Sequence, residues 1–138
     1  MTQNIVNTVG AVAAGFITYL FGVQDAMLGA LFAAVILDYI TGVMAAYNAK
    51  ELSSEVGFKG LIKKFFILAV VAMSNILDNA TGAGGMLRNM VMGFYIANEV
   101  LSLIENGARL GVPMPQKLKD ALEQLKGEKA AVNSFNQN

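Results

Sequence analysis

AMLGALFAAVILDYITGVMAAY, residues 26–47, is the most informative segment of this chain. It is 22 residues long and carries a single charge, Asp38, near its middle. About 20 mostly apolar residues are enough for a helix to cross the hydrocarbon core of a bilayer. A carboxylate at the centre of such a helix costs roughly 2.5–3.5 kcal/mol on insertion, so it marks a functional or assembly site. The alternative is a buried helix of a soluble protein with a hydrogen-bonded Asp38.

The composition of the whole chain favours the membrane. Of its 138 residues, 14% are charged and 55% are hydrophobic, with a mean hydropathy of +0.52. A soluble domain has about a quarter of its residues charged. The chain has no Cys and no His, which excludes disulfides, thiol chemistry and the usual zinc ligand sets. We expect no enzyme, and no catalytic, cofactor-binding or metal-binding residues; the basic segments are too sparse to predict nucleic-acid binding.

The pattern of apolar stretches predicts an all-α integral membrane protein. Four such stretches cover residues 5–22, 26–47, 65–80 and 86–104, within a transmembrane domain of residues 1–112. We expect four transmembrane helices, or three if the first stretch, rich in Ala and Gly, lies on the membrane surface. Lys and Arg are enriched on the cytoplasmic side of membrane proteins. Nine of the ten Lys and Arg residues lie in the loop 48–64 or after residue 106, so both segments and both termini are expected in the cytoplasm. The basic loop contributes Lys50, Lys59, Lys63 and Lys64.

The C-terminal segment, residues 113–138, has a different pattern. Pro115 suits the first position of a helix. Leu118, Leu122 and Leu125 then follow at helical spacing among charged residues. We expect a short cytoplasmic amphipathic helix here, followed by a flexible tail.

Two carboxylates are predicted to lie at one depth in the membrane. Asp38 and Glu99 stand twelve and thirteen residues from the outer ends of their spans, or about 18 and 20 Å at 1.5 Å per residue. Two ionised carboxylates at one level repel in a dry interior, so one should be protonated or both should face water. Either they hydrogen-bond helices together or they line an aqueous lumen. Arg88 lies nearer to Asp78 than to Glu99, so we expect it to reach Asp78.

Small residues four positions apart recur along the predicted spans, as at Gly42 and Ala46. Such spacing allows close contact between membrane helices, within or between copies. The polar and small residues within the spans are therefore the candidates for pore lining and assembly: Asp38, Gly42, Asn75, Asn98 and Glu99.

Several motifs also occur in a recognisable order: LDYITG at 37–42, GFKG at 57–60 before Lys63 and Lys64, FYIANE at 94–99, SLIEN at 102–106 and LGVPMP at 110–115. Over residues 26 to about 125, this order resembles the toxin-secretion/phage-lysis holin family of small bacterial and phage membrane proteins. The resemblance implies a multi-pass protein of the bacterial cytoplasmic membrane that homo-oligomerises into lesions. It implies release of an endolysin or a toxin as cargo, with no direct binding of that cargo and no cofactor.

Two other functions fit the residues as well. Charges in the middle of the membrane are also typical of a small oligomeric ion channel or a proton-coupled transporter. A non-conducting scaffold or holin antagonist would have the same sequence features. The sequence leaves open the number of copies, the lesion size and the protein released.

Overall fold

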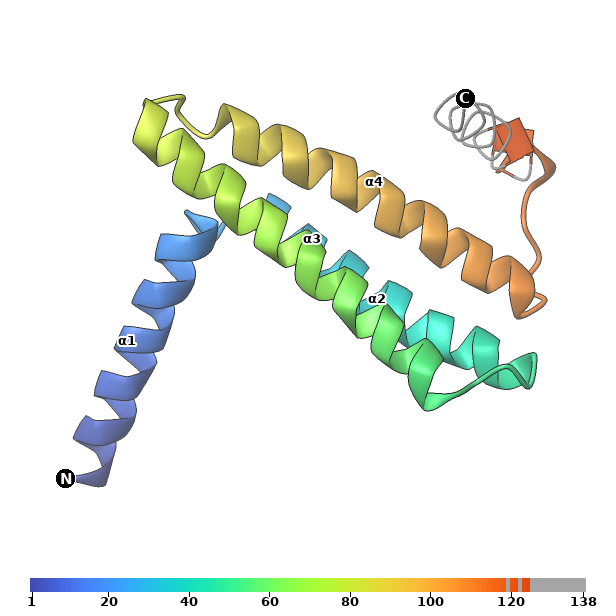
Figure 1. The fold of residues 1–138 in the computed structure, drawn as a ribbon, viewed down its shortest axis with the longest axis horizontal. Helices are drawn as coiled ribbons and strands as arrows, with labels where there is room; N and C mark the ends of the chain where they lie inside the picture. The colour runs from blue at the N-terminus through green and yellow to red at the C-terminus, as the bar shows by residue number, and fades with distance from the viewer. Residues whose placement is uncertain (119, 122, 125–138) are drawn as a thin grey trace.

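The structure, a computed structural model, describes residues 1–118, 120–121 and 123–124. This part of the chain forms four helices (Figure 1): α1 (Thr2–Phe21), α2 (Ala26–Asn48), α3 (Ser54–Thr81) and α4 (Met86–Arg109). The predicted all-α fold is therefore confirmed. Of the predicted C-terminal segment, residues 113–138, the described positions 116–118, 120–121 and 123–124 are helical, and the predicted tail lies outside the described residues.

Polar side chains and glycines set the helix ends. The Asp25 carboxylate accepts a hydrogen bond from the Leu28 N–H (2.9 Å) and caps α2, and the Ser53 hydroxyl caps α3 in the same way. These caps satisfy N–H groups that have no partner within the helix. Helix α3 ends at Gly82, whose φ of 70° is the left-handed conformation in which glycine is favoured.

Helix α3 begins eleven residues before the predicted third span, at residue 54 instead of 65. The predicted loop 48–64 is therefore too long, and only residues 49–53 connect α2 to α3. The prediction was wrong because the charged residues between 55 and 64 were assigned to a loop. They follow the Ser53 cap and belong to the first turns of the helix. An ion pair between Glu55 and Lys59 (2.7 Å), four positions apart, lies in the first turns of the helix.

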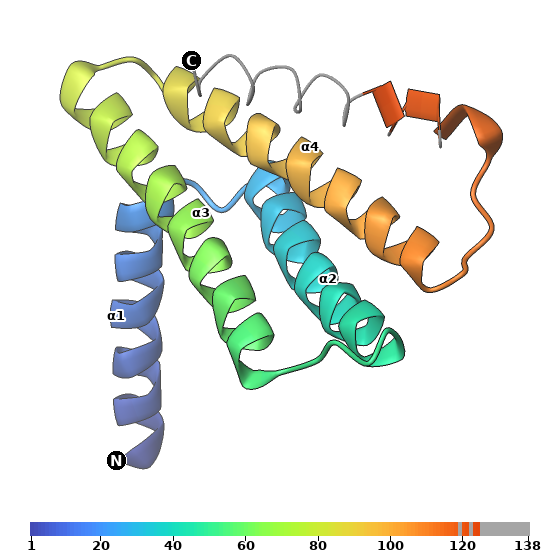
Figure 2. The same ribbon diagram turned by 45° about the vertical axis from the view of Figure 1, so that its right-hand side comes forward.

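Helices α2, α3 and α4 pack into a three-helix bundle, in which α4 contacts both α2 and α3 (Figure 2). Its core is apolar, and the most deeply buried large side chains are Leu31 of α2, Val71 of α3 and Met92 of α4. Packing these side chains against one another excludes lipid and water from the centre of the bundle. It also determines which face of each helix points to that centre.

Helix α1 leans away from this bundle, and both ribbon views show that only its C-terminal end lies against α3 (Figures 1 and 2). None of its residues is buried. Asn75 of α3 donates hydrogen bonds to the carbonyls of Tyr19 (3.1 Å) and Leu20 (3.2 Å), at the C-terminal end of α1. Helix α1 is thus an arm held at its C-terminal end.

Within the described residues, three helices are long and apolar enough to cross a membrane, by length and composition: α1, α2 and α3. The prediction allowed three crossings without the first stretch, but it is α4 that does not meet this criterion. The reason is that Arg88, Asn98 and Glu99 lie within α4. The face of α4 that carries Arg88 and Glu99 is buried in the bundle.

Successive helices run in opposite directions. The two short connections 22–25 and 82–85 lie at one end of the molecule, which we call the turn end (Figure 2). The connection 49–53 and the end of α4 lie at the other, the loop end, where Arg109 pairs with Glu51 (3.0 Å). This arrangement places the two connections that have no basic residue together and apart from the end that carries Lys50 and Arg109.

Candidate functional site

Three charged side chains meet inside the three-helix bundle. The Lys64 ammonium of α3 donates hydrogen bonds to Asp38 of α2 and to Glu99 of α4. Each of the three lies ten positions from the loop end of its helix, or about 15 Å along the axis. The structure thus brings Asp38 and Glu99 to one level, as their depths in the sequence led us to expect. We call Asp38, Lys64 and Glu99 the ion cluster.

The ion cluster is buried. The side chains of Lys64, Asp38 and Glu99 are only 13%, 12% and 6% exposed. A charge so placed is costly without a partner, whereas an ammonium between two carboxylates compensates much of that cost. Since its members come from three different helices, the cluster ties α2, α3 and α4 together.

Lys64 was predicted to belong to a cytoplasmic basic loop. The structure places it in α3 and directs its ammonium into the bundle. Sequence reasoning missed this role because it treated Lys63 and Lys64 alike as loop residues. The helical face decides between them, since residues adjacent in a helix point about 100° apart.

Asn106 extends the ion cluster toward the loop end. Its amide Nδ2 donates to Asp38 Oδ1 (3.0 Å) and lies within hydrogen-bonding distance of the Thr41 hydroxyl (3.1 Å). The Gly42 Cα faces the same amide, so that a Cβ there would lie 3.5 Å from Nδ2. Because Gly42 has no side chain, α2 and α4 of one copy can pack closely at this position. The sequence did contain a signal for Asn106, because it stands seven positions after Glu99 and so on the same helical face.

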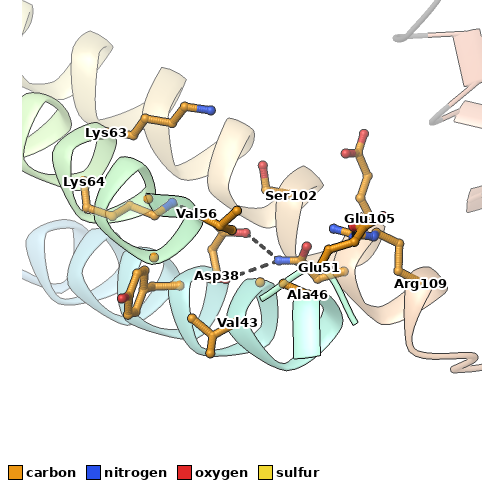
Figure 3. A pocket seen from close by; sticks show the side chains of 15 residues that line it. Asp38, Val43, Ala46, Glu51, Val56, Lys63, Lys64, Ser102, Glu105 and Arg109 are labelled. Carbon is orange, nitrogen blue, oxygen red and sulfur yellow. Dashed lines mark hydrogen bonds and ion pairs between the residues drawn. The ribbon is translucent and has the colours of Figure 1, made fainter. Parts of the chain in front are cut away.

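Two partly open pockets border the ion cluster. The first, of about 310 Å³, lies between α2, α3 and α4 toward the loop end (Figure 3). The second, of about 430 Å³, adjoins Glu99, Tyr95 and Phe66. Charged residues of both signs line the first pocket: Asp38, Glu51, Lys63, Lys64, Glu105 and Arg109. The ion cluster is therefore within reach of small ligands from the loop end.

A second polar cluster lies at the turn end, around Arg88. Its guanidinium donates to Asp25 Oδ2 (2.9 Å) and to the carbonyls of Phe21 (2.6 Å) and Val23 (2.9 Å). Asn89 accepts a further bond from it (3.2 Å). Arg88 thus binds the end of α1 and the connection to α2 at once, which a point-like ammonium cannot do.

The expected contact between Arg88 and Asp78 takes another form. Asp78 accepts hydrogen bonds from the backbone N–H groups of Leu87 (3.1 Å) and Arg88 (2.7 Å), and so caps α4. The Arg88 side chain turns to Asp25 instead. Proximity in the sequence suggested the wrong pair, because it could not show where the connection between α1 and α2 lies.

Asp25 is the titratable group whose ionisation this second cluster favours. Hydrogen bonds from the Arg88 guanidinium and from the Leu28 N–H hold the pKa of Asp25 below its usual value of 3.8. Both donors stabilise the charged carboxylate. Asp25 therefore remains ionised at neutral pH and keeps its bond to Arg88.

The other predicted site residues lie outside the ion cluster. Asn75 binds α1, and the half-buried Asn98 donates to the Phe94 carbonyl of its own helix (3.1 Å). Lys50 is exposed in the connection 49–53, and Lys59 and Lys63 are exposed on α3. Of the predicted candidates, the structure thus gathers Asp38, Gly42, Lys64 and Glu99.

The chemistry that these groups support is ionic rather than covalent. In the described part of the chain, no group of acidic, His or Cys residues is arranged to hold a metal ion. What the ion cluster can do is exchange partners, take up or release a proton, and face either the bundle or water.

Comparison with known proteins identifies relatives along most of the chain. Residues 15–127 match the model of the bacteriophage holin family. A protein of Clostridium perfringens, named only "Uncharacterized 14.9 kDa protein in nagH 3'region", is 43% identical, with 92% of this chain and 99% of that protein covered. The "Probable holin" of Bacillus phage phi105 is 36% identical, with 80% of this chain and 81% of that protein covered. No solved structure matches the chain.

Proposed function

The chain belongs to the bacteriophage holin family, and on that premise we propose that it opens lesions in the bacterial cytoplasmic membrane. The family is non-enzymatic, which confirms the prediction that the chain is not an enzyme. The chain is a multi-pass membrane protein, as the family and its three candidate spans indicate. Copies assemble into a homo-oligomer, and the opening lets an endolysin, or a toxin, leave the cytoplasm without binding to the protein.

The observation that best supports this proposal is the ion cluster. In the bundle described here, Lys64 neutralises charge inside a single copy and keeps it away from lipid. If the helices separate, the same side chains need water, because isolated charges are costly in hydrocarbon. An assembly whose lumen is lined by these groups satisfies that need. We therefore take the described bundle as the closed state and a water-lined oligomer as the open state.

We also propose that all four helices cross the membrane, with the loop end in the cytoplasm. The loop end carries Lys50, Lys59 and Arg109, and the basic C-terminal segment follows it, so the bias in Lys and Arg favours this orientation. Helix α4 crosses as a companion of α2 and α3, because the polar side chains of its inner face are buried and paired. Glu99 pairs with Lys64 of α3, and Arg88 bonds to the end of α1 and to the connection 22–25. Both termini then face the cytoplasm.

Orientation is tested with single cysteines in the otherwise Cys-free chain. Cys at Ser54 should resist a membrane-impermeant thiol reagent in intact cells before any lesion opens. Cys at Ala83, in the connection at the turn end, is the matched control and should react. The reverse pattern would reject this orientation.

Function is tested by inducing the protein in bacteria and following membrane potential, growth and release of a cytoplasmic reporter enzyme. Sudden depolarisation with enzyme release is the expected outcome. Ion flux without enzyme release would instead indicate a small oligomeric ion channel or transporter, which the buried charges also favour. Neither effect would indicate a scaffold or a holin antagonist.

A further inference from the structure

The ion cluster contains one carboxylate more than it has ammonium groups. Asp38 and Glu99 share the single ammonium of Lys64, so the fully ionised cluster carries one uncompensated negative charge. In a buried site this excess charge is costly, and binding a proton removes it.

Other charged groups around the ion cluster do not supply a second buried cation. On α3, Lys63 borders both pockets, but it is exposed, in contrast to Lys64. On α4, Glu105 adds a further carboxyl to the first pocket, and Arg109 pairs with Glu51 at the loop end. The phenols of Tyr39 on α2 and Tyr95 on α4 border the two pockets. None of these brings a positive charge to Glu99.

The two carboxylates differ in the hydrogen bonds they accept and in their burial. Asp38 accepts a hydrogen bond from Lys64 and another from the Asn106 amide (3.0 Å), and both favour its charged form. Glu99 accepts a hydrogen bond from Lys64 and is the more buried of the two, with a side chain 6% exposed against 12% for Asp38. The proton that neutralises the cluster therefore belongs on Glu99.

We propose that the ion cluster is a proton-binding site in which the closed bundle holds one proton on Glu99 and releases it when the helices separate. The proton-binding part rests on the bundle geometry alone, and the release part rests on the proposed function. The second pocket borders Glu99 itself, and the first reaches its cluster partners Asp38 and Lys64 from the loop end, so together they give the proton a path to that side of the membrane.

The sign of the resulting pH dependence follows from linkage. The closed state binds one proton more per copy than the open state, in which water solvates both carboxylates. Raising the pH on the loop side therefore favours opening, and lowering it favours the closed bundle. The closed–open equilibrium changes by up to about tenfold per pH unit and per copy.

Infrared spectroscopy of the full-length protein in lipid tests the binding site directly. At neutral pH we expect the C=O stretching band of a protonated carboxylic acid. Labelling the glutamate carboxyls with ¹³C should shift this band, and labelling the aspartates should not. Glu99→Gln should abolish it, and Lys64→Met should increase it, because both carboxyls then become neutral. Glu55→Gln, at an exposed carboxylate of α3, is the matched control and should leave it unchanged.

Leakage from liposomes tests the release step. With the parent protein, leakage should increase as the loop-side pH rises, and Glu99→Gln should lose that dependence while Glu55→Gln keeps it. Absence of the acid band, or a band that follows the aspartate label, would overturn the proton-binding site. An intact band with leakage that ignores pH would overturn the release step. If no leakage occurs at any pH, the proposed function fails, while the spectrum still decides the binding site.

Discussion

Lys63 and Lys64 are neighbours in α3, yet only Lys64 turns its ammonium into the bundle, where both Asp38 and Glu99 bind it. Lys63 is exposed. The two lysines therefore form a natural pair of test and control, with the same charge, chemistry and depth along the helix.

Replacing Lys64 with Met should destabilise the closed bundle by about 3–5 kcal/mol, because Asp38 loses its buried ion pair and must either stay charged without a partner or take up a proton. Lysis should begin earlier, measured as the time from induction to depolarisation at matched protein levels. Lys63→Met should keep the parent timing. Equal timing of the two variants would show that the buried contact does not hold the bundle closed.

Replacing Asp38 with Asn should delay or abolish opening. The carboxamide oxygen still accepts the hydrogen bond from Asn106, and Lys64 keeps Glu99 as a partner. The open state, in contrast, loses a charged group that water would solvate, so the equilibrium shifts toward the closed bundle. Asp38→Glu retains the charge and should keep partial function. The measurement is again the time to depolarisation, and unchanged timing of the Asn variant would mean that Asp38 only joins helices.

Replacing Gly42 with Leu should lower the stability of a single copy, because the side chain would press against Asn106 where only a Cβ fits. Overpacking of this kind costs about 1–3 kcal/mol. The thermal unfolding midpoint in detergent should fall for Gly42→Leu and stay near the parent value for Gly29→Leu, which faces open space in the same helix. Similar losses for both variants would argue that the contact between α2 and α4 does not depend on Gly42.

Replacing Arg88 with Gln should release the arm formed by α1, because the guanidinium bonds to Asp25 and to the carbonyls of Phe21 and Val23 are lost. Spin labels at the exposed positions Val12 and Met73 report the distance between α1 and α3. Their distance distribution should broaden in Arg88→Gln. Arg109→Gln, which removes an exposed pair at the loop end, should leave it narrow.

Replacing Asp25 with Asn should weaken the protein at neutral pH and have little effect in acid. The folded-state pKa of Asp25 is depressed, so its stabilisation is present above the unfolded value near 3.8 and disappears as the pH falls through the folded value. Since the Asp25 side chain is 40% exposed, the effect should be about 1 kcal/mol or less. Thermal midpoints of parent and variant, measured from neutral to acidic pH, should converge as the pH falls. A constant gap would assign the effect to the cap of α2 instead.

The sequence predicts features that depend on a single helix better than features that depend on which helices become neighbours. The common level of Asp38 and Glu99 follows from helical rise and span length alone. The role of Lys64 requires the start of α3, which depends on the Ser53 cap. The partner of Arg88 requires the position of a connection 63 residues away along the chain. Periodicity gives depth and face within one helix, but it does not show which helices become neighbours.

The attachment of α1 at its C-terminal end has a consequence for biosynthesis. A ribosome makes α1 first, but the groups that hold it, Asn75 and Arg88, come 56 and 67 residues after the carbonyls they bind. Until then the contact that α1 can make is the one between Phe21 and Phe32 of α2, so under the proposed topology α1 enters the membrane before either of its anchors exists. Docking of α1 is therefore among the last steps of maturation, and a nascent chain that stops before α4 leaves it unanchored by Arg88.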